Sequence, residues 1–228
     1  MKSFLIAAFS LWATISFSQT IKYPEWKKEA KTNIRLLPKY GHQAKTDKQK
    51  AADQELIDNY IAQEGTRRKA SEVLIEIGFE YLNRGEIKTA MYRFNQAWLL
   101  DPNNEDVFWG WGSVYFHFND YQKALEQYNE GLLLNPTNPR LLTDKATIYM
   151  GNYYDKNDSG AIKTAINLFS ESYAIDSTNQ NTTYKLAVAY YNIKDCDNAW
   201  KFYEICSKLG GNPIKPTFTK ALEANCKR

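Results

Sequence analysis

Hydrophobic residues over 72–82 recur at three- and four-residue spacing, which places them on one face of a helix. The residues that form this face are Val73, Leu74, Ile77 and Tyr81. The polar stretch 83–86 then predicts a turn, and a second apolar pattern leads to Asp101-Pro102. A residue before proline is pushed out of helical geometry, so this dipeptide should end the second helix. The stretch 71–104 therefore predicts a hairpin of two helices.

The pattern repeats with a period of 34 residues. Each apolar, small or proline position of the first hairpin has a counterpart of the same kind one period later. These counterparts are Phe108, Trp111, Gly112, Tyr115, Ala124, Tyr128, Gly131 and Pro136. The next small and aromatic pair, Ala165 and Phe169, lies 41 rather than 34 residues beyond Ala124 and Tyr128, so seven residues are inserted near 152–158. A hairpin cannot bury its apolar face alone, but stacked hairpins share a continuous core.

The motif Leu74-x-x-Ile77-Gly78-x-x-Tyr81, followed by Ala90, Phe94 and Pro102, resembles the tetratricopeptide repeat (TPR) family. The resemblance implies an all-α fold, a right-handed α-solenoid of about four helical hairpins. The repeats it implies are 71–104, 105–138, 139–179 with the insertion, and 180–213. Lys145 and Thr183 depart from the pattern, since the family usually has a large apolar residue at both positions.

The flanks of the array have the features of caps. Thr46 and Gln49 form a capping box that opens a helix to about Gln63, so 46–70 is predicted as the N-terminal capping helix segment. Residues 214–228 are predicted to hold a C-terminal capping helix, with Phe218 and Leu222 on its buried side. The stretch 19–45 has aromatic residues and prolines but no clear period. We expect it to be an irregular arm with one short helix at most.

Residues 1–18 have the pattern of a cleaved signal peptide. A positive charge at Lys2 precedes an apolar run over 4–17, and the small residues Ser16 and Ser18 precede the expected cleavage point. The alternative is a membrane anchor, but this run is shorter than the ~20 apolar residues that span a bilayer. We expect a periplasmic or secreted protein whose mature chain does not insert into a membrane.

The resemblance implies that four positions of each first helix face the concave side of the solenoid. The large apolar residues at these positions are Ile75, Phe79, Leu82, Trp109, Phe116, Tyr184, Val188 and Tyr191. An exposed apolar surface usually marks a binding site, and Trp and Tyr are enriched at binding hot spots. We therefore predict a groove for a protein or peptide segment. Two alternatives are that the 19–45 arm fills this groove, or that curvature of the array buries these residues.

The predicted function is that of an exported, non-catalytic adaptor or scaffold. One alternative is a glycan- or small-molecule-binding accessory subunit of an envelope enzyme system, with carboxylates from Glu72, Asp106 and Asp144. Another is a self-assembling structural repeat protein. Family members that grip a C-terminal carboxylate use Lys and Asn where this chain has Ile75 and Phe79, which speaks against that specificity.

The three cysteines fall near the end of the array. In the implied fold, Cys196 lies in the turn of the fourth hairpin, and an antiparallel capping helix would bring Cys226 back to that turn. We predict a Cys196–Cys226 disulfide, with Cys206 free and buried one helix length away. The alternative is three ordinary buried thiols. Export makes the disulfide plausible, because disulfides persist in oxidising compartments.

Composition limits the kinds of binding or catalytic site that the chain can form. The 29 basic and 26 acidic residues give a formal charge of +3, which argues against a dedicated nucleic-acid surface. Two histidines and three cysteines leave little for a metal site. The stretch 155–160 resembles the start of a calcium loop, but Ile166 stands where the loop needs Glu. We expect a polar loop there, with Asp158 or Ser159 capping the next helix, and no enzyme activity, cofactor or metal.

Overall fold

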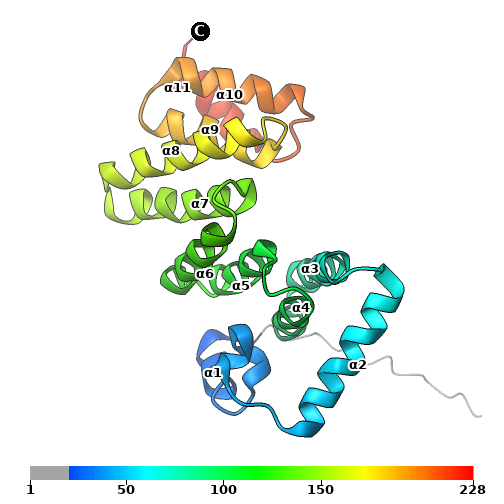
Figure 1. Ribbon diagram of the computed structural model, residues 1–228. Coiled ribbons are helices and arrows are strands. Elements are labelled where there is room, and N and C mark those ends of the chain that lie inside the picture. The colour runs from blue at the N-terminus through cyan, green and yellow to red at the C-terminus, as the bar shows by residue number, and fades with distance from the viewer. Residues whose placement is uncertain (1–20, 228) are drawn as a thin grey trace, which may run out of the picture.

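The computed structural model describes residues 21–227, so the predicted signal peptide lies outside the described residues. Between residues 21 and 227 the chain is all-α, with eleven α-helices and two short 3-10 helices. Four helical hairpins follow one another as a curved stack (Figure 1). Within residues 21–227, no helix is long and apolar enough to cross a bilayer.

Each hairpin pairs a first helix with an antiparallel second helix. The four pairs are α3 (Arg67–Asn83) with α4 (Ile87–Leu100), α5 (Glu105–His117) with α6 (Tyr121–Leu134), α7 (Pro139–Lys156) with α8 (Ser159–Ile175), and α9 (Gln180–Asn192) with α10 (Cys196–Lys208). The flanking helices are α1 (Tyr23–Glu29), η1 (Ile34–Leu36), η2 (Pro38–His42), α2 (Asp47–Glu64) and α11 (Pro216–Asn225).

Local sequence fixes where these helices begin. The second helices α6, α8 and α10 start after an aspartate whose carboxylate accepts a backbone N–H of the first turn. The first helices α5, α7 and α9 start in the same way after an asparagine. Such side chains satisfy backbone donors that have no partner within the helix. The repeated Asn and Asp residues thus determine where the helices of each of these hairpins begin.

The turn inside a hairpin uses a left-handed residue. Gly85, Asn119 and Lys194 occupy equivalent repeat positions and all have positive φ, at 78°, 59° and 62°. In each case the next residue donates its backbone N–H to the carbonyl five residues earlier, with N···O distances of 2.9–3.0 Å. This is the bond pattern that closes a helix C-terminus when one residue turns left-handed. Three different residue types therefore make the same turn.

The seven-residue insertion is helical, and the expectation of a polar loop was wrong. α7 continues to Lys156, and only Asn157 and Asp158 separate it from α8. Asn157 takes a left-handed conformation, and the Asp158 carboxylate accepts the backbone N–H of Gly160 and Ala161. The extra residues lengthen both helices of the third hairpin. The capping role expected for Asp158 is present.

Small residues let the two helices of a hairpin approach closely. A methyl group built on Gly112 would lie 2.1 Å from Cε1 of Tyr128. Tyr128 is only 1% exposed, so its ring has no free space to move into. A similar contact joins Gly78 to Phe94 in the first hairpin. The glycine of the repeat motif is therefore a packing requirement.

Replacing Gly112 with alanine should lower the free energy of unfolding by about 1–3 kcal/mol, because overpacking forces a buried ring out of place. Gly151, inside α7, offers a matched control, because an added methyl group there meets no atom within 4 Å. Gly151→Ala should instead raise stability by up to about 1 kcal/mol, since alanine favours helix over glycine. Urea denaturation of both variants measures the difference. Equal effects would contradict this packing argument.

The N-terminal arm is ordered and packs on the outer side of the first two hairpins. Trp26 and Leu36 are 1% and 0% exposed and belong to the same core as the first two hairpins. The side-chain amide of Asn95, on α4, donates to the carbonyls of Arg35 and Leu37 at 2.8 and 3.0 Å. Lys39 pairs with Glu130 of α6 at 2.5 Å. The described part of the arm is therefore bound to the second helices and not to the groove side of the first helices.

The helix expected from the Thr46 capping box to about Gln63 is α2. α2 ends at Glu64, Gly65 has a φ of 81°, and the Thr66 side chain then caps α3. Because α3 starts at Arg67, the first hairpin begins four residues earlier than the repeat pattern indicates. α2 packs against α3 (Figure 1).

Candidate functional site

The concave side of the solenoid holds a groove formed by two adjoining hollows. The first has a volume of about 580 Å³ and the second about 790 Å³. Phe79, Asn83 and Trp109 border both hollows, so the two are continuous. α3 supplies one wall, while α5 and α7 supply the rest. The groove therefore joins the first three repeats.

Two aromatic rings in close, tilted contact form the floor of the groove. The ring centroids of Phe79 and Trp109 are 3.9 Å apart, and Phe79 also contacts Phe94 of the core at 5.1 Å. Both floor rings are half-buried. Ile75 lines the same hollow and is only 5% exposed. This floor offers apolar contact area that is already rigid before anything binds.

Polar partners fix the orientation of the Trp109 ring. Its indole Nε1 donates a hydrogen bond to Oδ2 of Asp144 at 2.7 Å. The guanidinium of Arg140 lies 5.3 Å from the centroid of the same ring, a distance at which a cation is attracted to an aromatic face. Trp109 is thus held from both an edge and a face by the next repeat.

Ion pairs run across neighbouring repeats along the groove. Arg140 binds Asp106 at 2.6 Å, and Lys185 lies 3.7 Å from Asp144. The ammonium of Lys185 also donates to Oγ1 of Thr147 at 2.7 Å. Burial lowers the pKa of Lys185, and the charge of Asp144 opposes that shift. Both carboxylates are therefore engaged within the chain.

An acidic row borders the first hollow. Glu72, Glu76 and Glu80 follow at four-residue intervals on α3 and all line this hollow. Glu80 pairs with Arg84 at 3.0 Å on the surface. Glu72 and Glu76 are exposed, and neither has an ion-pair partner among the described residues. The groove therefore combines an apolar floor with an unneutralised negative wall.

The structure divides the eight predicted groove residues into two groups. The residues that line the two hollows are Ile75, Phe79, Leu82, Trp109 and Phe116. Tyr184, Val188 and Tyr191 lie instead in the C-terminal core cluster. The rings of Tyr184 and Tyr191 each contact Phe218 of α11 edge-on, with centroids 5.6 Å apart. In the fourth repeat, the capping helix uses part of the predicted binding surface.

Sequence reasoning missed several groove residues. Glu76 was not singled out, and neither Arg140 nor Lys185 was connected with Trp109. A signal was nevertheless available, because Asp106 and Arg140 are one period apart, and Asp144 and Lys185 are one period plus the insertion apart. Equivalent positions of adjacent repeats lie side by side, so comparing them across the period would have paired these charges.

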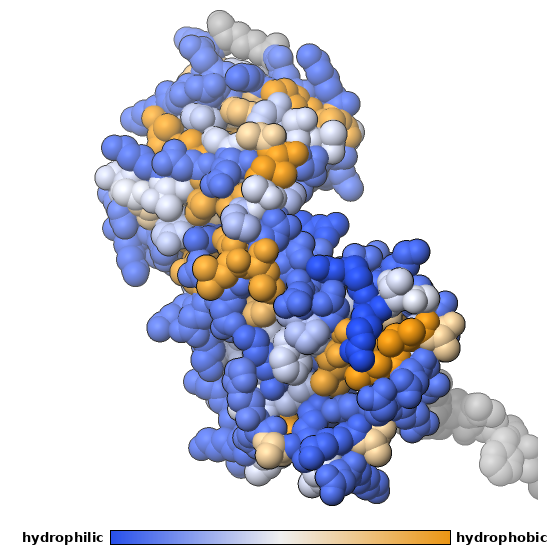
Figure 2. Space-filling view, in the orientation of Figure 1, coloured by the Kyte–Doolittle hydropathy of each residue, from blue (hydrophilic) through white to orange (hydrophobic). Residues whose placement is uncertain are grey.

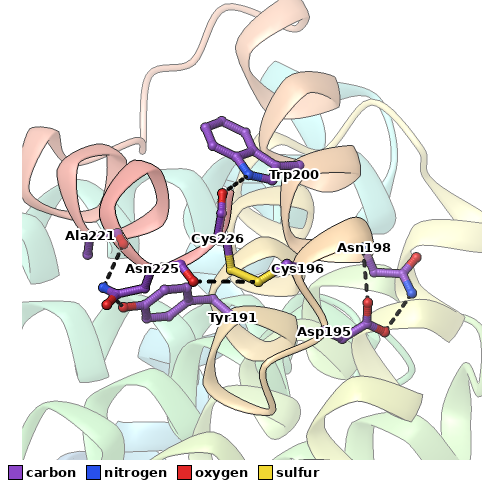
Figure 3. Close-up of a disulfide and its surroundings, with 8 residues drawn as sticks. All are labelled: Tyr191, Asp195, Cys196, Asn198, Trp200, Ala221, Asn225 and Cys226. Carbon is purple, nitrogen blue, oxygen red and sulfur yellow. Dashed lines mark hydrogen bonds between the residues drawn. A yellow bond between two sulfur atoms is a disulfide. The ribbon is translucent and has the colours of Figure 1, made fainter. Parts of the chain in front are cut away.

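A disulfide ties α11 to the fourth hairpin (Figure 3). It joins Cys196, at the start of α10, to Cys226, with Cα atoms 5.2 Å apart. Nearby, the indole of Trp200 donates to the carbonyl of Cys226 at 2.8 Å. Asn225 donates to the hydroxyl of Tyr191 at 2.9 Å. Cys206 is a free, buried thiol. The C-terminal helix is therefore fixed by a covalent bond and by hydrogen bonds to two helices.

Exposed apolar residues also lie outside the groove. Leu133 and Leu134, at the end of α6, are 83% and 45% exposed, and Ile175 at the end of α8 is 42% exposed. Figure 2 shows hydrophobic residues gathered at the surface in the region of α6.

Among residues 21–227, no group of three or more His, Cys, Asp or Glu side chains is arranged to hold a metal ion.

Comparison with known proteins shows the fold. No protein-family model and no curated protein sequence matches the chain. Among solved structures, PilF from Pseudomonas aeruginosa aligns with a TM-score of 0.53 and 21% identity over 64% of each chain, less than two thirds of its length. A thermophilic TPR protein from Thermus thermophilus aligns with a TM-score of 0.54 and 13% identity, over 62% of this chain and 75% of that one. The chain therefore has the fold of a tetratricopeptide repeat solenoid.

Proposed function

We propose that the protein is an exported, non-catalytic adaptor that holds a segment of another polypeptide in its concave groove. The observation that carries this proposal is the half-buried Phe79–Trp109 pair, whose ring centroids lie 3.9 Å apart on the floor of a continuous groove. Rigid aromatic anchors in a concave site are the usual hot spots of protein interfaces. The pattern of residues 1–18 and the Cys196–Cys226 disulfide support export to a periplasm or the cell exterior.

The glycan alternative has less support. Sugar binding usually needs free carboxylates beside an aromatic platform, and Asp106 and Asp144 are already paired with Arg140 and Lys185. Only Glu72 remains of the three carboxylates that this alternative would use. A polypeptide needs fewer such groups, because its side chains can bury apolar area on the floor.

Photo-crosslinking in living cells tests the proposal. A photoreactive residue at Phe116, which lines the second hollow, should form an adduct with one dominant polypeptide. The same residue at Glu171, exposed on α8, is the matched control and should give no such adduct. Adducts at both positions, or at neither, would overturn the proposal.

Two further variants connect the adduct to the groove. Trp109→Ala removes the aromatic floor, and Asn83→Trp places a large ring at an exposed position that borders both hollows. Each should reduce the yield of the Phe116 adduct by about tenfold or more, because losing or blocking a hot spot costs at least ~2 kcal/mol of binding free energy. Asn83→Trp changes no buried residue, so its effect does not depend on the stability of the fold.

A further inference from the structure

The charges of the groove point to the chemistry of its partner, an inference that rests on the proposed function. Five carboxylates border the groove, from Glu72, Glu76, Glu80, Asp106 and Asp144. Three of them are neutralised inside the chain, by Arg84, Arg140 and Lys185. Among the described residues, Arg140 is the one Lys or Arg that lines either hollow, and it already pairs with Asp106. Glu72 and Glu76, beside the aromatic floor, have no ion-pair partner among the described residues.

These two carboxylates have a defined geometry. They lie one helical turn apart on the same face of α3, which separates them by about 6 Å along the helix axis. Ile75 and Phe79 alternate with them on the side that borders the same hollow. Any segment bound along α3 would therefore meet negative charge and apolar surface at once.

We propose that the groove binds a basic segment of a partner protein, with Lys or Arg side chains facing Glu72 and Glu76 and a bulky apolar side chain on the Phe79–Trp109 floor. Opposite charges across an interface raise the association rate and exclude like-charged competitors. An acidic segment would be repelled by the unpaired wall. A neutral apolar segment would leave this wall without a partner.

Selection from a random peptide display library tests this on the full mature chain. The Asn83→Trp variant, whose groove is blocked, serves as the counter-selection. Peptides that bind the wild type and not this variant should carry net positive charge and at least one large apolar residue. Enrichment of neutral or acidic peptides would overturn the charge assignment and leave the adaptor proposal standing. Absence of any groove-dependent peptide would overturn both.

The selected peptide then measures the role of the two carboxylates. The double variant Glu72→Gln, Glu76→Gln should weaken its binding by about three- to tenfold, the range expected for two exposed ion pairs. The loss should shrink at high salt, where screening shortens the reach of exposed charges. The matched control, Glu55→Gln with Glu171→Gln, removes the same charge from other exposed positions and should leave the affinity unchanged. An equal loss in both variants would show only non-specific attraction and would overturn the inference.

Light scattering tests whether the basic segment in the groove comes from a second copy of this chain. The arm over 21–45 holds seven Lys or Arg and two Glu. In each molecule the arm is bound to α4 and α6 of its own chain. Concentration-dependent self-association that is lost in the Glu72→Gln, Glu76→Gln variant would identify the arm of a second copy as the occupant, and would overturn a separate partner protein.

Discussion

Replacing Trp26 with alanine is expected to lower the free energy of unfolding by about 3–5 kcal/mol, the range for deleting a buried Trp side chain. Trp26 is 1% exposed and its ring centroid lies 5.1 Å from that of Phe118. Trp26 is the largest fully buried side chain of the arm, so its ring supplies much of the buried apolar area that attaches the arm. We expect the arm to detach before the hairpins unfold.

Chemical denaturation and amide hydrogen exchange together measure this effect. The exchange of residues 26–40 and of the α4 and α6 surfaces they cover should become faster in Trp26→Ala. Lys28→Ala is the matched control, since Lys28 is exposed on the same short helix and its removal should change stability by less than about 0.5 kcal/mol. A loss below about 1 kcal/mol in Trp26→Ala would mean that the arm is not anchored through this residue.

The positions of the repeats could be predicted because helix packing requires particular residue types at a fixed period. Close approach of two helices requires a small residue at Gly78 and Gly112, and the ring that fills the space beside it recurs at Phe94 and Tyr128. These constraints have a fixed period, so they are visible without a structure. The helical insertion was not predictable in this way, because a stretch with five polar residues among seven looks like a loop until both neighbouring helices are seen to extend.

The docking of the arm could not be predicted for a different reason. Irregular backbone must satisfy its carbonyl groups individually, and here a single amide, that of Asn95, bonds two of them. In the repeat pattern Asn95 and Gln127 look like solvent-facing residues of second helices, yet they are 0% and 8% exposed. The covered surface is polar in sequence, so hydrophobic patterning gives no sign of it.

The groove was predictable in part. The repeat register correctly brings together Phe79 and Trp109, because both occupy positions that face the inner side of the bend. It does not show that α11 packs on Tyr184 and Tyr191, since Phe218 approaches from outside the repeats. The charge pattern that favours a basic partner could not be predicted from the sequence, because it depends on which carboxylates already form ion pairs in the folded chain.

Removing the disulfide with Cys196→Ser and Cys226→Ser is expected to lower the free energy of unfolding by roughly 3.5 kcal/mol. The bond closes a span of 30 residues, and the chain-entropy relation gives this value for that length. The loss should be concentrated at α11, whose buried Phe218 and Leu222 pack against the fourth hairpin. Faster hydrogen exchange of 216–225, with little change in α3 to α6, would be the local signature.

Reduction of the wild type should reproduce this loss, while the same reductant should leave the double variant unchanged, which separates the bond from the substitutions themselves. Thiol titration of denatured, unreduced protein should find one reactive thiol, that of Cys206, and three would exclude the bond. Because Phe218 covers Tyr184 and Tyr191, release of α11 should also expose these two rings to solvent. An unchanged Phe116 adduct in the double variant would then show that the groove of the first repeats functions independently of this end of the solenoid.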